Sequence, residues 1–365
     1  PLRALGRVSV RPGERISETN GRASVMTTLG VNAFGVGRGS QKYDAMVELA
    51  REAEASGCAA IWTSELYNRS ATIPMAALAA GTSTIQIGSN IAYGVGRTPL
   101  IWAAEARDLD ELSDGRIILG LGNGTPKMME AWHGVNGEAP AARMSELLQV
   151  MKKLWRLHEG PVDHDGRFYS IHVNPAAGVP EPVRPEIPLW TAGVNKLMLR
   201  VAGEHADGLI GHPMFTADYV RGPVAEELAV GAARADRDPA GVTLMGITMC
   251  AIDDDLDLAR RQAAYAIGQY AASRVYDRLF EIHGWSADQQ KIRDAARNRD
   301  NDALVDAVTD EMVDAIAIVC KPSEFSAKLA ELPEVFDHRD LIAPPWGLTD
   351  EQTRATTSHI LNGIR

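Results

Sequence analysis

Short apolar runs and longer segments of helical period alternate along the chain from Thr28 onward. The runs are rich in Val, Ile, Leu and Ala, whereas the segments between them repeat apolar residues every three or four positions. The runs cover residues 29–33, 59–63, 85–91, 116–121, 188–192, 208–212, 242–252 and 315–320. A strand followed by a helix, repeated in this way, is typical of a parallel sheet with crossover helices. The pattern predicts an α/β fold whose eight strands close into a (β/α)₈ barrel.

Three of the intervening segments carry clear helix signals. Residues 41–55 end just before Gly57, and residues 99–112 begin with Pro99, whose missing N–H is harmless in a first turn. Residues 141–157 place their large apolar side chains along one face. These segments are therefore predicted to be helices that pack on the barrel.

Two longer segments interrupt the alternation. Residues 160–185 are rich in Pro, Gly and His, which predicts a hairpin or loop that covers a pocket. Residues 254–311 are strongly helical and too long for one crossover. They predict a helical subdomain at the barrel mouth or an oligomer interface.

The two ends of the chain differ in character from the barrel, which we expect to occupy residues 26–335. Residues 1–25 are rich in Arg, Gly and Ser with little apolar periodicity, which predicts a disordered or non-native extension. Residues 336–365 predict a loop at 337–346 and a terminal helix at 350–361.

Composition narrows the class of partner. The formal net charge is −11 and no run is rich in Lys or Arg, which argues against nucleic acid and favours a small molecule. Cys58, Cys250 and Cys320 lie in apolar runs, as buried reduced thiols do, which fits the cytoplasm. No apolar run approaches the ~18 residues of a membrane span, and no signal peptide is evident at the N-terminus.

The active site of such a barrel lies at the C-terminal ends of its strands, so residues just after the runs are informative. Glu65 follows the second run and is either a general acid or base or an ordinary cap. The Ser89 and Asn90 pair interrupts the third run, as a bulge with or without a functional role would. His212 ends the sixth run and either donates to a cofactor or substrate or packs structurally.

Glycines and a helix start point to a flat or anionic ligand. Gly120, Gly122 and Gly124 alternate at the end of the fourth run, which fits either a tight turn or a backbone that a ligand approaches closely. Residues 191–196 lead into a helix whose first N–H groups are suited to a phosphate. No His-x-x-x-His, Cys-x-x-Cys or Gly-x-Ser-x-Gly motif is present, so we expect an organic cofactor and no metal.

Four ordered stretches resemble the bacterial-luciferase-like superfamily of flavin- and deazaflavin-dependent oxidoreductases. They read KYDAMVELAREAEASGCAAIWTSE, TSTIQIGSNIAYGVGRTP, ARDLDELSDGRIILGLGNG and IPLWTAGVNKLMLRVAGEHADGLIGHP. The resemblance covers residues 28 to about 332 and is strongest to the branch that uses coenzyme F420, in particular to methylenetetrahydromethanopterin reductase. It implies a TIM-like barrel without a metal, in which hydride moves between C5 of the deazaflavin and the substrate at the barrel mouth.

The resemblance also implies which residues hold the coenzyme. Glu65 stands where the family usually has an Asp near the deazaflavin ring. A non-prolyl cis peptide is implied beside Asn90, in the bond before or after it. The implied cofactor-binding residues are Ser89, Asn90 and Ile91 in the bulge, Gly122, Asn123 and Gly124 along the coenzyme, and Gly193, Val194 and Asn195 at its phosphate.

The chain departs from the family pattern at positions that bear on the substrate. Leu66 replaces a frequent His, Thr125 replaces a common carboxylate, and Phe215 replaces the Lys that a sugar-phosphate-using relative would need. We therefore expect an F420-dependent oxidoreductase that forms a homodimer and acts on a small, largely apolar or heterocyclic substrate beneath residues 160–185. The alternatives are an FMN-dependent monooxygenase and a cofactor-binding barrel without catalysis.

Overall fold

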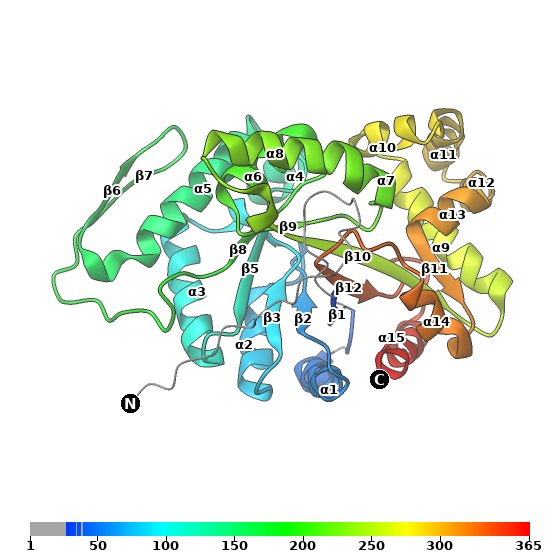
Figure 1. Cartoon of the computed structure of the whole chain (residues 1–365), viewed down its shortest axis with the longest axis horizontal. Helices are drawn as coiled ribbons and strands as arrows, with labels where there is room; N and C mark the ends of the chain where they lie inside the picture. Colours follow the sequence, from blue (N-terminus) through cyan, green and yellow to red (C-terminus); the bar gives the residue numbers. More distant parts are fainter. Residues whose placement is uncertain (1–26, 34, 38) are drawn as a thin grey trace, which may run out of the picture.

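The computed structural model describes residues 27–33, 35–37 and 39–365, and the extension expected at 1–25 lies outside them. Within the described residues, eight parallel strands close into a barrel that helices surround (Figure 1). The barrel strands are, in sheet order, β1 (Thr28–Asn32), β2 (Ala60–Thr63), β3 (Gln86–Ser89), β5 (Ile117–Gly122), β8 (Leu189–Ala192), β9 (Gly208–Ile210), β10 (Thr243–Ile252) and β12 (His338–Ile342). Strand β12 pairs with both β10 and β1 and so closes the sheet. The predicted (β/α)₈ barrel is confirmed.

The helices that follow the barrel strands also agree with the sequence pattern. The segments predicted at 41–55, 99–112 and 141–157 are helical to within a few residues at each end. The outer helices are α1 (Lys42–Ala55), α2 (Thr72–Gly81), α3 (Pro99–Ser113), α5 (Pro140–Trp155), α6 (Lys196–His205), α8 (Ala225–Arg234), α14 (Phe325–Ala330) and α15 (Asp350–Ile364). Short helices α4 (Pro126–His133) and α7 (Ala217–Tyr219), and the two-residue strand β4 (Ala92–Tyr93), lie in the loops at the strand ends.

The eighth barrel strand is not the one that the sequence predicted. Residues 315–320 form the end of helix α13 (Asp310–Ile316) and strand β11 (Ala317–Cys320), which pairs only with the far half of β10. The barrel is closed instead by β12, within a segment predicted to be a loop, so the boundary expected at residue 335 falls before the last strand. The predicted terminal helix is confirmed as α15.

Strand β12 was missed because its sequence, HRDLI, lacks the apolar character of a buried strand. The strand is nevertheless buried along most of its length, because its polar side chains find partners inside the fold. The indole Nε1 of Trp62 donates to His338 Nε2 at 2.9 Å. On the outer face, Arg339 donates to Thr248 Oγ1 at 3.1 Å and stacks over the Phe336 ring.

Residues 160–185 contain the predicted hairpin, formed by β6 (Val162–Asp165) and β7 (Ser170–Val173). Its apolar side chains, including Val162, pack against Ala103 of α3 and against Val150 and Leu154 of α5. Figure 1 shows the hairpin at the margin of the molecule, beside α5. The expectation that it covers a pocket at the mouth is wrong, because its apolar face is already buried against the outer helices.

The second insertion is helical, as predicted, and consists mainly of helices α9 to α13. After α9 (Leu256–Ala271) come α10 (Asp277–Ile282), α11 (Ser286–Asn298), α12 (Asn301–Asp306) and α13. These helices gather on one side of the barrel, beyond β10 and β11 (Figure 1). The turn after α9 reaches the barrel, since Asn195 Nδ2 donates to the carbonyl oxygen of Val275 at 3.2 Å. The insertion therefore borders the mouth.

Two indole rings fill the barrel interior. Trp62 of β2 and Trp190 of β8 lie with ring centroids 5.4 Å apart, and both are buried. Glycines on neighbouring strands make room for them: a Cβ on Gly88 would lie 2.1 Å from Cζ3 of Trp62, and one on Gly208 would lie 2.5 Å from Cδ2 of Trp190. The interior below the mouth is thus packed with side chains, as in other barrels of this type.

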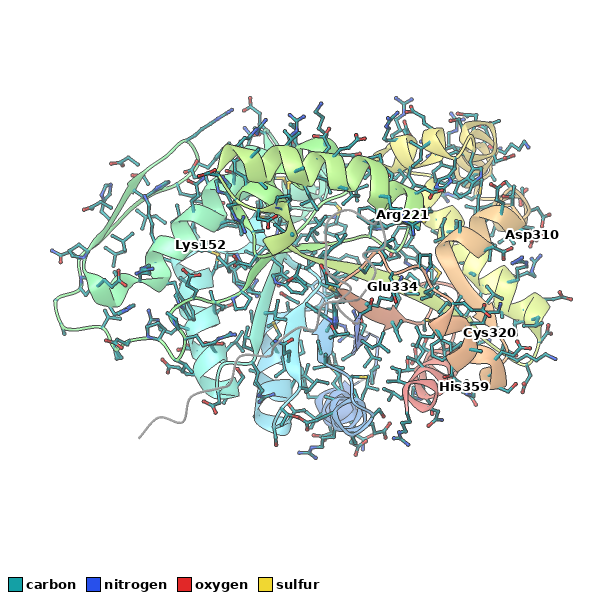
Figure 2. All side chains as sticks on the ribbon, viewed as in Figure 1. Lys152, Arg221, Asp310, Cys320, Glu334 and His359 are labelled. Atoms are coloured by element: carbon teal, nitrogen blue, oxygen red, sulfur yellow. The ribbon has the colours of Figure 1, made fainter. Side chains whose placement is uncertain are left out.

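Most charged side chains of the described residues lie on the outside of the molecule, with Asp110, Arg339 and Asp340 as buried exceptions. Figure 2 places Lys152 of α5 and Asp310 of α13 on opposite sides of the barrel. The three cysteines are free and buried, as predicted. Among the described residues, no helix combines the length and apolar character that crossing a bilayer requires.

We expect Gly88→Ala to lower the free energy of unfolding by about 3 kcal/mol, because the added methyl group overlaps the Trp62 ring. Gly222→Ala is the matched control, since nothing lies within 4 Å of a Cβ there. We expect the control to stay within about 0.5 kcal/mol of wild type. Urea unfolding followed by circular dichroism measures both, and equal stabilities of the two variants would contradict the proposed packing.

Candidate active site at the barrel mouth

Above the two indole rings, the next inward-facing residues form the layer where the barrel opens. Alternation along the strands places a polar half of this layer on β12, β1, β2 and β3, which are adjacent in the sheet. Small and apolar residues occupy the other half, on β5, β8 and β10. The polar half consists of Asn32, Ser64, Asn90 and Asp340, and the other half includes Gly122, Ala192 and Ile247.

The polar half is one hydrogen-bonded network. Asn32 Nδ2 donates to Asn90 Oδ1 and to Asp340 Oδ2, each at 2.9 Å. Asn90 Nδ2 donates to the same Asp340 oxygen at 2.6 Å. The Ser64 hydroxyl lies 2.9 Å from both the backbone oxygen and Oδ1 of Asn90. These contacts fix the orientation of the Asn90 amide, since its oxygen faces donors and its nitrogen faces a carboxyl group.

Asp340 is the member of this network that the sequence did not reveal. It is fully buried, and its Oδ1 has no hydrogen-bond partner among the residues that the structure describes. Burial raises the pKa of Asp340 to about 7, although the amides of Asn32 and Asn90 act in the opposite direction. The available signal was the alternation of His338 and Asp340 in a short segment, which is the spacing of one strand face.

The end of β3 is arranged as the resemblance implied. The peptide bond between Asn90 and Ile91 is cis, at one of the two expected positions. The Ile91 side chain lies against Gly122, where a Cβ would be 3.0 Å from Ile91 Cδ1. Ser89 is buried and exchanges hydrogen bonds with the backbone of Gly120, at 2.8 and 3.0 Å. Asn90 and Ile91 therefore border the mouth, while Ser89 joins β3 to β5.

The three alternating glycines have three different surroundings. A Cβ on Gly120 would lie 2.0 Å from the Ser89 carbonyl oxygen and 2.4 Å from Cδ1 of Ile210, so the barrel's own packing excludes a side chain. Gly124 has a φ of +65°, a conformation that favours glycine. Gly122 is the one of the three that lies in the layer at the mouth. A close approach by a ligand is therefore proposed for Gly122 alone.

Asn123 has one buried amide atom without a partner. Its Nδ2 donates to the carbonyl oxygen of Pro140 at 2.6 Å, which ties the loop after β5 to the start of α5. Its Oδ1 is buried and accepts no hydrogen bond. Because buried polar atoms are nearly always paired, this oxygen is a candidate acceptor for a ligand donor.

Both carboxylate oxygens of Glu65 are already engaged. Oε2 accepts from the backbone N–H of Tyr93 at 2.8 Å, and Oε1 accepts from Arg97 Nη1 at 3.0 Å. Arg97 also pairs with Glu105 at 2.9 Å. Glu65 thus holds the loop after β3 in place through both of its carboxylate oxygens.

The start of α6 has unpaired backbone donors. Asn195 is the residue before the helix, but its side chain donates to Val275 and forms no cap. The Val194 carbonyl oxygen accepts from the Tyr219 hydroxyl at 2.8 Å, which fixes the turn after β8. Among the described residues, no side chain caps the first N–H groups of the helix, so they are candidate donors to an anion; the role expected for residues 193–195 at a phosphate stays a prediction.

His212 follows β9 at the mouth and belongs to an aromatic cluster. Its Nδ1 accepts from the Met214 backbone N–H at 3.2 Å, and its Nε2 lies 2.8 Å from the Tyr276 hydroxyl. The ring of Tyr270 meets His212 edge-on at 4.4 Å and meets Trp346 at 4.5 Å. Burial lowers the pKa of His212 to about 3, so the ring is neutral at physiological pH.

In the structure, the candidate residues form two groups at the barrel mouth, and further residues that the sequence analysis did not name join one of them. Asn90, Ile91 and Gly122 border one opening, and residues 193–195 and His212 lie at the ends of β8 and β9. Tyr270, Tyr276 and Trp346 were missed, because they come from the helical insertion and from the loop after β12. Nothing in their local sequence indicates that they meet His212.

Two cavities lie outside this mouth. One of about 400 Å³ is in the helical insertion, and the other, of about 210 Å³, lies beside Thr216, Ile247 and Arg339. The first is lined by Ala272, Arg274, Gln290, Arg293, Ala296 and Arg297. Within the described ranges, no three His, Cys, Asp or Glu side chains gather as metal ligands do.

Comparisons with known proteins place the chain among related sequences. A family model described as luciferase-like monooxygenase matches residues 24–339. An uncharacterised protein of Mycobacterium tuberculosis (strain ATCC 25618 / H37Rv) is 30% identical over 286 residues, which cover 76% of this chain and 82% of that protein. The 5,10-methylenetetrahydromethanopterin reductase of Methanolobus tindarius is 27% identical over 307 residues, covering 83% of this chain and 91% of the enzyme.

A solved structure shares the architecture. The coenzyme F420 dependent tetrahydromethanopterin reductase from Methanopyrus kandleri superposes with a TM-score of 0.73 at 22% identity. The match covers 93% of this chain and all of that chain. At this level of identity the similarity establishes the common fold.

We expect the stability of the protein to fall as pH rises from about 4 to about 7, because the folded state binds the Asp340 proton more tightly than the unfolded state does. Asp340→Asn removes this dependence. Between pH 5 and pH 8, wild type should lose about 2–3 kcal/mol relative to the variant, at ~1.4 kcal/mol per pKa unit.

Urea unfolding at several pH values measures this difference. Asp257→Asn, at an exposed position in α9, controls for the loss of one carboxylate and should keep the wild-type pH dependence. If the free energy of unfolding depends on pH in the same way for wild type and Asp340→Asn, the pKa of Asp340 lies near its ordinary value and the prediction is wrong.

Proposed function

The chain belongs to the luciferase-like monooxygenase family, and from this premise we propose that it is an oxidoreductase that binds coenzyme F420 at the barrel mouth. Bound there, the coenzyme would supply hydride transfer at its C5 to or from a small organic substrate. Support comes from a relative and a structural neighbour that are both named as reductases, the neighbour as F420 dependent.

The two-sided layer at the mouth carries this proposal. Asn32, Ser64 and Asn90 are half-buried and present polar groups on one side, while Gly122 and Ala192 leave space on the other. A flat heterocycle with carbonyl and N–H groups along one edge fits such a layer, because its polar edge finds partners and its faces meet small side chains. Asn123 Oδ1 is a further acceptor beside Gly122.

The start of α6 fits the phosphate of the same coenzyme. Its first backbone N–H groups lack a side-chain cap, and the helix is long enough to carry a positive N-terminal dipole end. Tyr219 and Val275 hold the turn from both sides, through Val194 and Asn195 respectively. A phosphate bound here would meet a preformed turn, which lowers the ordering cost of binding.

The chain's own residues would act mainly by positioning. The ion pair of Glu65 with Arg97 and its hydrogen bond from the Tyr93 backbone N–H hold the loop after β3. We assign Glu65 to the support of this loop, where a negative charge also polarises nearby groups. Holding two reactants in fixed orientation accounts for a large part of the rate in such reactions.

The decisive experiment is a titration of the purified protein with F420 and, separately, with FMN, followed by cofactor fluorescence. We expect micromolar or tighter binding of F420 and at least tenfold weaker binding of FMN. Preference for FMN, together with oxygen consumption by the reduced flavin complex, would instead identify a monooxygenase. Tight binding without turnover of any substrate would identify a binding protein.

We expect Ala192→Leu to weaken F420 binding at least tenfold, because the larger side chain fills the small half of the layer at the mouth. Ala296→Leu adds the same atoms to helix α11, away from the mouth, and should bind F420 as wild type does. Fluorescence titration of both variants, with thermal unfolding as a check on folding, provides the measurement. Equal affinities would place the coenzyme elsewhere.

A further inference from the structure

The hydrogen bonds of His212 determine which of its ring nitrogens carries the proton. The Met214 backbone N–H donates to Nδ1 at 3.2 Å, so Nδ1 offers a lone pair and carries no hydrogen. The neutral ring must then carry its hydrogen on Nε2. Because Nε2 lies 2.8 Å from the Tyr276 hydroxyl, His212 is the donor in that contact and the Tyr276 oxygen is the acceptor.

This assignment leaves the Tyr276 hydroxyl hydrogen without an acceptor. The contact with His212 is the single hydrogen bond that the structure gives this hydroxyl among the described residues. The side chain is 8% exposed, so water has little access to it. The hydroxyl therefore has its acceptor role filled by the His212 N–H, whereas its own hydrogen has no acceptor within the described ranges. A buried donor hydrogen left without an acceptor is costly, which points to an acceptor supplied by a ligand.

Tyr276 is placed where a ligand at the mouth would meet it. The carbonyl oxygen of the preceding residue, Val275, accepts a hydrogen bond from Asn195 at the start of α6. His212 lies two residues after the end of β9. Tyr270 and Trp346 continue the aromatic cluster towards the loop after β12. The hydroxyl is thus tied to the residue two positions after β9, and the residue beside Tyr276 is tied to the start of α6.

We propose that Tyr276 is a catalytic residue that donates its hydroxyl hydrogen to the oxygen of a carbonyl substrate, and that His212 is the positioning residue that orients it. The proposal rests on the proposed function and deepens it, because it names the substrate class as ketones and aldehydes, or the corresponding alcohols. The donor would come from the helical insertion, and the coenzyme would be held by the barrel.

The step balances in electrons and protons. In the direction of reduction, a bound reduced F420 would supply hydride to the carbonyl carbon, and the π electron pair of the C=O bond would move to oxygen. The Tyr276 proton passes to that oxygen to complete the alcohol. The phenolate left behind would accept the His212 Nε2–H bond already in place, and it would regain its proton from water that enters the mouth once the alcohol has left.

The surroundings keep both groups in the required state. Burial raises the pKa of Tyr276 above its ordinary value, so the hydroxyl retains its proton at physiological pH. Burial keeps the His212 ring neutral, so Nδ1 continues to accept from Met214 and Nε2 continues to donate. A fixed donor of this kind, aimed at a position where charge develops, accelerates reactions by about 100-fold or more.

Tyr270 offers a matched comparison. It belongs to the same cluster, with its ring 6.1 Å from that of Tyr276, but it contacts His212 through its ring edge. Phenylalanine at either position keeps the aromatic packing and removes one oxygen. The hydroxyl oxygen of Tyr276 accepts the hydrogen bond from His212, whereas Tyr270 meets His212 only through its ring.

The first test needs neither coenzyme nor substrate. Nitrogen NMR of protein labelled in histidine distinguishes a ring with hydrogen on Nε2 from one with hydrogen on Nδ1, and His212→Gln identifies the signals. We expect the Nε2–H form in wild type and in Tyr270→Phe, with a shifted Nε2 signal in Tyr276→Phe. The Nδ1–H form in wild type would overturn the proposal, because Tyr276 would then donate to His212.

The second test measures turnover of acetone, cyclohexanone and benzaldehyde with reduced F420. We expect Tyr276→Phe to lower kcat by about 100-fold with a smaller change in KM, and Tyr270→Phe to stay within about threefold of wild type. Equal losses in both variants, or full activity of Tyr276→Phe, would overturn the assignment. Wild type that binds F420 but reduces none of these compounds would overturn the substrate class.

Fluorescence titration of the three proteins with F420 separates this proposal from the proposed function. We expect wild type, Tyr270→Phe and Tyr276→Phe to bind F420 within about twofold of one another. If none of them binds F420, the proposed function fails, whatever the state of His212. If all bind and only the kinetic expectation fails, the role of Tyr276 is refuted and the coenzyme assignment stands.

Discussion

The packing of Trp62 inside the closed barrel is the constraint on which the rest of the site depends. The ring occupies space that Gly88 and Gly30 leave open, contacts Trp190, and donates to His338 on the strand that closes the sheet. Closure of the sheet and packing of Trp62 in the barrel interior therefore depend on each other, because β12 carries the acceptor for the indole N–H of Trp62. This packed layer sets the depth of the mouth, so that a ligand meets the next layer of side chains and goes no deeper.

That next layer is built from distant parts of the chain. Asn32, Asn90 and Asp340 come from the first, the third and the last barrel strand, and a single carboxyl oxygen accepts from both amides. The aromatic side opposite them has a similar origin, since Tyr276 comes from the helical insertion and Trp346 from the loop after β12. Each side thus depends on the barrel having closed, and neither exists as a local motif.

Sequence reasoning succeeded where local pattern and tertiary environment agree. The first seven strands are apolar because they are buried on both faces, and alternation with helices indicated a barrel directly. It failed at β12, whose polar residues are buried in pairs. It found the hairpin at 160–185 but not its place, because the apolar face of the hairpin packs against α3 and α5. Glu65 illustrates the same limit, because its position at a strand end was visible but its ion pair with Arg97 was not.

The sequence by itself determined the class of fold, the strand ends that form the mouth and, through its resemblance, the expectation of a deazaflavin coenzyme. These follow from periodicity and short motifs, which are properties of neighbouring residues. Only the tertiary structure decided that Asp340 accepts from Asn90, that Gly120 is required by packing, and that His212 meets Tyr276. The physical reason is that burial and hydrogen-bond partners depend on which strands and helices become neighbours when the barrel closes.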